Sequence, residues 1–408
     1  MIFSDIAGKT GMFLDGDWIE KKDQDPNGKV RLIQLADIGA GEFKDKSNRF
    51  LTEEKASELH CTFLKKGDIL IARLGEPLCK ACIFPLDGLY ITAVDIAILR
   101  IGYEQANPKF LVYLINSPWF KDQVKRFESG TTRKRISRKN LDRIDIELPP
   151  IPEQERIVAR IEEMFSQLDA GVETLKKTKA QLAVYRQAVL KEAFDSASED
   201  CRMLTIGEIL TKTRKGMSTG PFGTMIKKTD HRTNGVPMLG IENIGVGKFV
   251  DGNKIFVTEE KAIELKSFAL KAGDIIVSRS GTVGELCAVP ERAAGSLLST
   301  NLMRISLDSN IIRSDYFISL FQSKGIVLDQ IKELCKGSTR DFLNQTILKQ
   351  IVFPVPSLDK QKEIVSVIES RMSVCDSINQ TVDTALQQAE AMRQSILKQA
   401  FEGEERTC

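Results

Sequence analysis

The sequence predicts a mixed α/β (α+β) chain made of two similar globular parts and two long helices that pair as an antiparallel coiled coil. Three observations predict it: a duplication shifted by about 207 residues, short β-rich runs in each half, and a proline-poor heptad stretch after each set of runs. The length of 408 residues also exceeds what a single core usually organises.

The duplication is carried by four collinear blocks. "FLTEEKASEL" (50–59) recurs as "FVTEEKAIEL" (256–265), "LKKGDILIARLG" (64–75) as "LKAGDIIVSRSG" (270–281), "GTTR" (130–133) as "GSTR" (337–340), and "YRQAVLKEAF" (185–194) as "MRQSILKQAF" (392–401). The shift is almost the same for all four, and chance does not supply a collinear set. Because solenoid repeats run roughly 20–50 residues, each half is instead a globular part with an appended element.

The globular parts alternate strand-like and helix-like segments. "VRLIQLADIG", "GDILIARLG" and "LYITAVDIAILRI" read as short strands broken by Gly, and "PKFLVYLINSPWFKDQVKRF" reads as helix. The second half repeats this order with "VPMLGIENIG", "GDIIVSRSG", "STNLMRISL" and "SDYFISLFQSKGIVLDQIKEL". We expect the chain to divide into residues 1–150, 151–198, 199–356 and 357–408, which are globe, long helix, globe and long helix.

The appended element reads as a long helix with a seam. Pro149, Pro150 and Pro152 end what precedes, and no proline follows from Glu153 to about Asp195. A helix of 43 residues spans about 65 Å, longer than a small domain, so its partner is the other copy rather than its own globe alone. The predicted interface positions are Ile161, Leu168, Leu175, Leu182 and Val189 in the first copy and Ile368, Cys375, Val382, Ala389 and Ile396 in the second, with Met164 and Tyr185 at the other heptad position.

Antiparallel pairing would place the globes at opposite ends of a rod, related by an approximate two-fold axis. It would also bring the two repeated helix ends into equivalent surroundings. The alternative is an amphipathic helix lying on its own globe. The second junction, "VPSLDKQKEIVSVIE", has Lys360–Gln361 where the first has Glu153–Gln154, and it lacks the double proline. The start of the second helix is therefore less sharply defined.

The composition describes an ordinary folded protein with no whole-molecule charge signal. The apolar fraction is 42%, the charged fraction 28% and the net charge +2, so any basic footprint must be local. No apolar run is long enough to span a bilayer and no basic segment precedes an apolar one at the start, so we expect a cytoplasmic protein without a membrane segment. Eight cysteines are too few for a disulfide scaffold and are expected as free thiols.

Two local stretches are strongly basic. Residues 121–143 hold nine basic and three acidic side chains, and residues 212–232 hold six basic and one acidic. Gly, Ser and Thr are interleaved with them, so such loops offer donors to phosphates and base edges. A solvated basic face without a ligand is the alternative. One basic stretch per repeat, held apart by a rod, favours a long polyanion such as double-stranded DNA.

The loops differ between the repeats, "DGDWIEKKDQDPNG" against "STGPFGTMIKKTDHRTNG", so the predicted target has two different half-sites. Arg73 and Arg279 end equivalent strands beside Gly75 and Gly281, where a salt bridge inside each globe is the alternative to DNA contact. The other candidate DNA-contacting residues are Arg133, Lys134, Arg135, Arg138, Lys139 and Arg340, and, in the second basic loop, Lys215, Ser218, Thr219, Phe222, Lys227 and Lys228.

Motifs for catalysis are missing or incomplete. "LPPI" has no amide or carboxylate before its prolines, unlike an amino-methyltransferase motif, and "GIENIGVGKF" (240–249) has the wrong glycine spacing for a phosphate loop. Cys79 and Cys82, with His60 and Cys61, match the residue types of a zinc site, but the second repeat has no ligands at the corresponding positions. His60 and His231 are the only histidines, which disfavours histidine acid–base chemistry.

The ordered set of "LPPIPEQERIVARIEEMF" (148–165), "RQAVLKEAF", "GDILIARLG", "TGPFGT" and the half-chain duplication resembles the specificity subunit of type I restriction–modification systems. The resemblance implies that each globe is a target recognition domain reading one half of a bipartite DNA site through the major groove. It implies that the antiparallel coiled coil sets the spacing, and that the subunit is not itself an enzyme.

The resemblance also implies partners. Two modification subunits, which bind S-adenosylmethionine and methylate adenine, would dock on the helices and globes. Two motor and nuclease subunits would complete the restriction enzyme. S-adenosylmethionine, ATP and Mg are then expected on the partner subunits only, and no cofactor or metal on this chain. The competing hypotheses are a coiled-coil scaffold that binds proteins but no DNA, and a self-sufficient DNA-modifying enzyme with diverged motifs.

Overall fold

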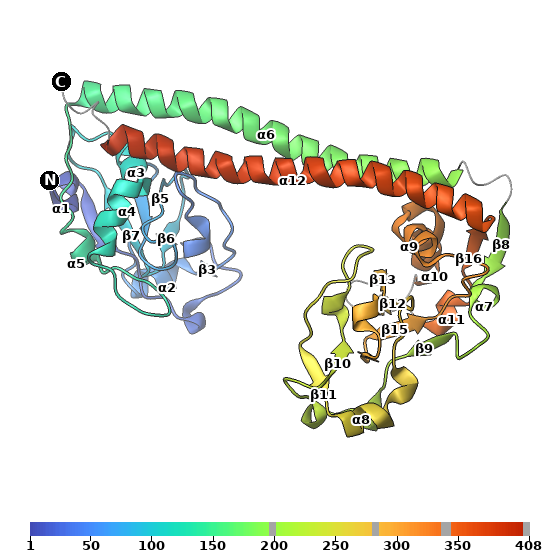
Figure 1. The fold of residues 1–408 in the computed structure, drawn as a ribbon. Helices are drawn as coiled ribbons and strands as arrows, with labels where there is room; N and C mark the ends of the chain where they lie inside the picture. The colour runs from blue at the N-terminus through green and yellow to red at the C-terminus, as the bar shows by residue number, and fades with distance from the viewer. Residues whose placement is uncertain (196–200, 280–284, 336–343, 403–408) are drawn as a thin grey trace. The chain divides into compact units, whose positions relative to one another are not determined.

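The computed structural model describes residues 1–195, 201–279, 285–335 and 344–402 (Figure 1). The chain splits into two compact units: unit 1 comprises residues 1–176 and 383–408, and unit 2 comprises residues 177–382. Each unit holds one globular part together with a portion of each long helix. The predicted class, two similar α+β globes with two long antiparallel helices, is confirmed.

The two long helices are α6 (Ile151–Asp195) and α12 (Leu358–Glu402). Pro152 stands at the second position of α6, where its missing N–H has no helical partner to lose. The start of α12, less sharply defined by the sequence, lies at Leu358, and Gln361 is fully buried there as Gln154 is in α6.

Unit 1 contains two sheets. The larger is antiparallel in the order β1-β7-β4-β5, and the smaller has the order β3-β2-β6, with β2 antiparallel to β3 and parallel to β6. Their bounds are β1 (Met12–Asp15), β2 (Val30–Ile33), β3 (Phe50–Leu51), β4 (Ile69–Ala72), β5 (Ala81–Ile83), β6 (Tyr90–Thr92) and β7 (Ile96–Arg100); the helices are α1 (Phe3–Ala7), α2 (Glu53–Glu58), α3 (Pro108–Asn116), α4 (Pro118–Lys125) and α5 (Arg138–Leu141).

Unit 2 repeats both sheets, as β9-β15-β12-β13 and β11-β10-β14, and adds the pair β16-β8. Its strands are β8 (Arg202–Thr205), β9 (Met217–Thr219), β10 (Val236–Leu239), β11 (Ile255–Val257), β12 (Ile275–Ser278), β13 (Leu286–Ala288), β14 (Leu297–Leu298), β15 (Leu302–Ile305) and β16 (Val352–Val355). Its helices are α7 (Ile206–Ile209), α8 (Glu259–Glu264), α9 (Ser314–Gln322), a π-helical turn (Lys324–Leu328), α10 (Asp329–Cys335) and α11 (Gln345–Leu348).

The strand register shows that the two globes are copies. Ile69 on β4 lies opposite Leu99 on β7, and Ile275 on β12 lies opposite Ile305 on β15. Ile275 follows Ile69, and Ile305 follows Leu99, by the same shift in residue number that separates the repeated sequence blocks. The duplication is therefore a duplication of structure, down to which residues face each other in the sheet.

Each globe packs its sheet against a helix pair and against the long helices. In unit 1 the core around Phe3, Phe110 and Phe120 also takes in Ile161 of α6 and Leu397 of α12. Unit 2 has the corresponding core, in which α9, β16 and both long helices meet. Burial of this apolar surface, at roughly 25 cal/mol per Å2, fixes each globe to both helices.

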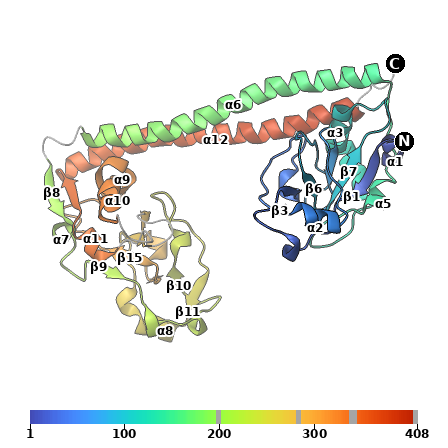
Figure 2. The same cartoon turned by 180° about the vertical axis from the view of Figure 1, so that it is seen from behind.

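Within each unit the two long helices run antiparallel, side by side in both views (Figures 1 and 2). In unit 2, Arg186 pairs with Asp376 at 2.5 Å, and Glu192, further along α6, pairs with Arg371, which comes earlier on α12. In unit 1, Arg393 of α12 pairs with Asp169 of α6. The Arg393 and Arg186 pairs join residues at the same repeat positions.

The heptad positions are buried to different degrees. Ile161, Val189, Ile368, Cys375, Val382 and Ala389 are buried, whereas Leu168, Leu175, Leu182 and Ile396 are half-buried. Tyr185, expected at the second heptad position, is 48% exposed and so is not an interior residue of the seam, while Met164 is half-buried. Two helices alone cover only part of each other, which leaves the middle leucines of α6 partly open.

The repeated helix ends meet equivalent surroundings. Phe401, at the end of α12, packs against Phe110 of α3 in unit 1 with ring centroids 5.4 Å apart. Phe194, at the end of α6, packs against Tyr316 of α9 in unit 2 at 5.6 Å. This expectation is confirmed, and it explains the repetition. Each helix end packs into the core of one globe, and the two cores have similar shapes, so similar side chains fill both.

Candidate nucleic-acid interface

In unit 1, residues singled out separately in the sequence lie next to one another. Arg73 directly follows β4, and its backbone C=O accepts from Ile136 N–H at 3.0 Å, while Gly75 N–H donates to the Lys134 C=O at 3.1 Å. The Arg135 backbone pairs in turn with Ser129. The basic segment 133–139 therefore runs along the exit of β4 and forms one surface with it.

Arg73 is held inside unit 1. Only 8% of Arg73 is exposed, its guanidinium pairs with Asp15 at 2.9 Å, and it donates to the Ile136 C=O at 3.2 Å and to the Val94 C=O. The internal salt bridge, the alternative left open by the sequence, is what the structure has. A buried, multiply bonded guanidinium positions the loop backbone.

Arg138 shares the same carboxylate. Its Nε lies 3.3 Å from Asp15, it donates to the Phe13 C=O at 3.3 Å, and its guanidinium lies 5.7 Å from the centre of the Phe13 ring. Asp15 was not anticipated from the sequence. The only signal in the sequence was the pair Asp15–Gly16, which the structure places at the end of β1, and unit 2 carries Thr219 at the corresponding strand position.

Most of the remaining candidates of unit 1 are exposed. Arg133, Arg135 and Lys139 are exposed, while Lys134 is half-buried and pairs with Glu128 at 3.1 Å and Glu76 at 3.9 Å. Exposed arginines on a loop whose backbone is tied to a sheet suit phosphate or base contact, because the scaffold is rigid and the cations are accessible.

The segment that follows Gly75 is held by hydrogen bonds from the buried amine of Lys121. Lys121 of α4 donates to the C=O groups of Leu78 (2.7 Å) and Cys79 (2.5 Å), and burial lowers its pKa to about 8. Burial also raises the pKa of the Cys79 thiol to about 11, and Cys79 has a left-handed backbone with φ of 57°. Lys121, which sequence reasoning did not single out, therefore fixes the segment that follows Gly75.

In unit 2 the candidates separate into strand and loop residues. Ser218 is buried and Thr219 half-buried, and both belong to β9, where they pair with β15. Lys215 is exposed, but its C=O accepts from the buried Arg304 at 3.0 Å. Phe222, Lys227 and Lys228 are exposed on the loop that follows. Arg279 directly follows β12 and donates to the Thr300 C=O at 3.3 Å, whereas Gly281 and Arg340 lie outside the described residues.

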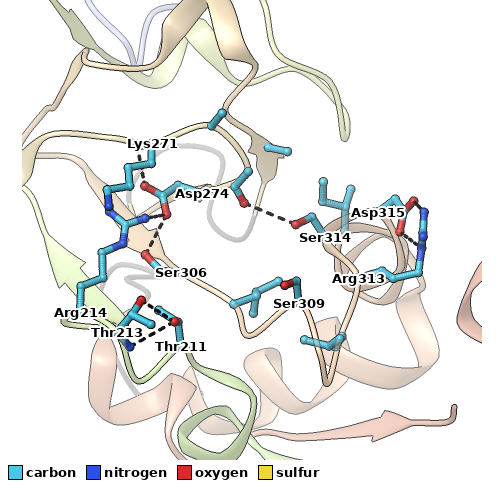
Figure 3. A pocket seen from close by; sticks show the side chains of 16 residues that line it. Thr211, Thr213, Arg214, Lys271, Asp274, Ser306, Ser309, Arg313, Ser314 and Asp315 are labelled. Atoms are coloured by element: carbon cyan, nitrogen blue, oxygen red, sulfur yellow. Dashed lines mark hydrogen bonds and ion pairs between the residues drawn. The ribbon is translucent and has the colours of Figure 1, made fainter. Parts of the chain in front are cut away.

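Arg214, in the same basic stretch, is engaged in the fold. Figure 3 shows Arg214, Ser306 and Lys271 converging on the buried carboxylate of Asp274. Ser306 donates to it at 2.8 Å, as does the Lys271 N–H, beside a hollow of 670 Å3 rimmed by threonine and serine hydroxyls. In unit 1 the equivalent Asp68 is instead paired with Arg100, at 2.7 Å.

Each unit also has a groove between its globe and its two helices. In unit 1 it has a volume of 1120 Å3 and is bordered by Glu162, Asp169 and Arg393; in unit 2 it has 450 Å3 and is bordered by Arg186 and Asp376. Arg186, with the additional contact of Lys248 at 3.3 Å, lowers the pKa of Asp376 below its ordinary value. Lys248 comes from the β10–β11 connection, so that loop contacts the helix pair in unit 2.

No group of three or more His, Cys, Asp or Glu in the described ranges is arranged to hold a metal ion. Among those same ranges, no helix combines the length and the apolar character needed to cross a bilayer.

The sequence profile of the type I restriction–modification DNA specificity domain matches this chain twice, over residues 10–183 and 199–388. The chain belongs to this specificity family. It has two recognition domains of that family, the first mostly in unit 1 and the second mostly in unit 2.

Two curated members of the specificity family illustrate the similarity. The StySPI specificity subunit of Salmonella potsdam is 24% identical over 310 residues, which cover 73% of this chain and 65% of that subunit. The EcoBI specificity subunit of Escherichia coli is 25% identical over 328 residues, covering 75% of this chain and 67% of that subunit. The matched region thus spans about two thirds of each relative's length.

One solved structure agrees in fold over nearly the whole chain. It comes from work on complex assembly and conformational transition of the type I restriction–modification system. The two folds superpose with a TM-score of 0.71 over 99% of this chain and 97% of that one, at 18% identity. This likeness establishes the fold of the specificity chain.

Proposed function

We propose that this chain is the non-catalytic, DNA-reading subunit of a type I restriction–modification complex. Each recognition domain reads one half of a bipartite, asymmetric target on double-stranded DNA, through the major groove. The observation that carries the proposal is the pair of family-matched segments, each with its own cation-bearing loop on a duplicated sheet.

The charges favour DNA over a protein ligand. Exposed arginines and lysines cluster on the loop 133–139 of unit 1 and on 227–232 of unit 2, although the net charge of the chain is only +2. Local clusters of this kind bind phosphates and steer association without making the whole molecule basic. Because the two loops differ in sequence, the two half-sites differ too, and the target is not a palindrome.

We infer that the long helices set the spacing between half-sites and dock two modification methyltransferase subunits, with contributions from the globes. The groove in each unit lies where helices and globe meet, which suits such a partner. Motor and nuclease subunits complete the complex. S-adenosylmethionine, ATP and Mg belong to those partners, and the complex works in the cytoplasm.

Single-molecule methylation sequencing of the host genome tests the reading function. We expect one split motif with two unlike halves, lost when the gene for this chain is deleted. Footprinting of the assembled complex should protect both halves. A complex that assembles but leaves no split footprint supports the coiled-coil scaffold instead.

A second experiment addresses catalysis. The chain alone, incubated with target DNA and labelled S-adenosylmethionine, should transfer no methyl group, whereas the complex should. Methyl transfer by the chain alone identifies a self-sufficient enzyme and overturns the assignment of catalysis to the partners.

The spacing role has its own test. Inserting one heptad within 165–185 and a matching heptad within 372–392 keeps the seam in register, since the apolar positions recur at every heptad. The gap between half-sites should lengthen while each half-site keeps its bases. Changed half-sites with an unchanged gap contradict the proposal.

A further inference from the structure

The loops that follow β1 and β9 begin with a glycine at the same structural position. Gly16 N–H donates to the Ile96 C=O at 2.8 Å, and Gly220 N–H donates to the Leu302 C=O at 3.1 Å. The two acceptors are equivalent residues of the duplicated sheets, at the start of β7 and of β15. A Cβ on either glycine would lie within 2.3 Å of a backbone oxygen, so only glycine fits.

Two residues beyond each glycine stands a solvent-exposed aromatic side chain. Trp18 is 71% exposed and Phe222 is 66% exposed, the largest values of any aromatic side chain among the described residues. The loops otherwise share little, "DGDWIEKK" against "TGPFGTMIKK". The two loops differ in sequence, yet both have a large aromatic side chain two residues after the glycine. Neither side chain is part of a hydrophobic core.

Both aromatics emerge beside the cation-bearing surface of their own unit. Trp18 lies three residues from Asp15, which holds Arg73 and Arg138. Hydrogen bonds from Lys22 and from the Trp18 indole lower the pKa of the Glu20 carboxyl. The Trp18 ring itself is largely exposed and so can contact a partner.

In unit 2 the same neighbourhood recurs. Gly220 packs against the backbone of Ser299, and the neighbouring residues Thr300 and Asn301 accept hydrogen bonds from Arg279, at 3.3 and 3.0 Å. Phe222 follows on this loop, with Lys227 and Lys228 five and six residues further on. An exposed ring on the same loop as exposed cations suits nucleic-acid recognition, with the cations on phosphates and the ring on a base.

We propose that Trp18 and Phe222 each insert against a nucleobase of the half-site read by their own unit, opening one base step by stacking. The inference rests on the proposed DNA-reading function and deepens it. Apolar side chains that wedge between base pairs require steps that unstack easily, and pyrimidine–purine steps are the most flexible. Part of the specificity for each half-site then comes from how easily one base-pair step of the DNA unstacks.

The first arm of the test measures affinity with the complete complex and a duplex carrying the split motif. Trp18→Ala and Phe222→Ala should each weaken binding by about 5- to 150-fold, the range of base–aromatic stacking. Trp18→Phe should retain most of the affinity, because a flat ring remains. Tyr103→Ala and Ile263→Ala, which remove other exposed apolar side chains of units 1 and 2, should leave it unchanged.

The second arm reports stacking directly. 2-Aminopurine, which brightens when unstacked, is placed at each position of both half-sites in turn. We expect a position in the first half-site whose 2-aminopurine signal is changed by Trp18→Ala and not by Phe222→Ala, and the converse in the second. If no position in either half-site changes its signal in these variants, the inference is overturned, because any unstacking would then come from other parts of the complex.

The outcomes separate the two proposals. If the complex protects a split site but both alanine variants bind normally and change no 2-aminopurine signal, the stacking inference is overturned and the DNA-reading function stands. If the unaltered complex binds no split site, both fall together.

Discussion

Gln154 and Gln361, which stand at equivalent positions of the duplicated chain, make the same three hydrogen bonds in their separate units. Gln154 accepts from the Asn107 N–H (2.8 Å) and donates to the C=O groups of Gln105 and Pro149, both at 2.8 Å. Gln361 accepts from the Arg313 N–H (2.8 Å) and donates to the C=O groups of Ile311 and Pro356, both at 2.9 Å. Each glutamine thus ties the start of a long helix to the loop before α3 or α9.

Replacing either glutamine should loosen that one junction. Gln154→Leu removes the partner of one partly buried N–H and of two partly buried C=O groups, which should cost about 1–3 kcal/mol. Hydrogen exchange should show lost protection near Asn107 in unit 1 only, and Gln361→Leu should do so near Arg313. Gln388→Leu, on the exposed face of α12, is the matched control. Unchanged exchange at Asn107 in Gln154→Leu would show that the clamp is dispensable.

The helix ends offer a second prediction. Phe401→Ala should destabilise unit 1 by about 3–5 kcal/mol, because a buried ring against Phe110 is lost and a cavity remains. Limited proteolysis should then cleave the last turns of α12. Met392→Ala, which removes a side chain that is 55% exposed, should not sensitise the helix. Equal protease resistance of the two variants contradicts the docking of this helix end.

What the sequence could predict follows from periodicity and repetition. The heptad spacing predicts the seam, and the shared blocks predict two equivalent sheets. Both can be seen in the sequence because they depend on the order of the amino acids along the chain. The glutamine clamps could not be foreseen, since their partners are backbone groups with no sequence signature.

The position of Trp18 was hidden for another reason. The separation of Gly16 and Gly220 is shorter than the shift of the repeated blocks, so aligning the blocks does not bring Trp18 opposite Phe222. Only the strand register reveals that the two loops correspond. The roles of Arg73 and Arg214 likewise depend on Asp15 and Asp274, carboxylates that the fold brings to them from distant segments.

The helix seam should respond to charge according to burial. Ile368 is 3% exposed and belongs to the core of unit 2, whereas Leu182 is half-buried. Ile368→Asp should therefore unfold unit 2 or destabilise it by several kcal/mol, while Leu182→Asp should cost clearly less, because its carboxylate reaches water. Urea unfolding followed by circular dichroism measures both. The reverse order would mean that the half-buried leucines carry the seam.

The two kinds of arginine in unit 1 should behave differently. Arg135→Ala should weaken DNA binding and reduce the slope of log affinity against log salt by about 1, because an exposed phosphate contact is removed. Arg73→Ala should instead destabilise unit 1, since Asp15 and two C=O groups lose a partner. Lys9→Ala, which removes an exposed cation outside the segment 133–139, is the control. A folded Arg135→Ala protein with an unchanged salt slope removes Arg135 from the interface.

Lys121 should make the stability of unit 1 depend on alkaline pH. Its pKa is about 8 in the folded chain against 10.5 for the free side chain, so between these values the unfolded state binds more protons. Stability attributable to Lys121 therefore rises with pH through that window, by up to about 3 kcal/mol. Lys121→Met removes this rise, although it also leaves the C=O groups of Leu78 and Cys79 without their donor at every pH. The unfolding free energy of the wild type minus that of Lys121→Met should thus grow from pH 8 to 10.5. Lys125→Met, on the exposed end of the same helix, should show no such growth, and a pH-independent difference for Lys121→Met would mean that burial does not lower the pKa of this amine.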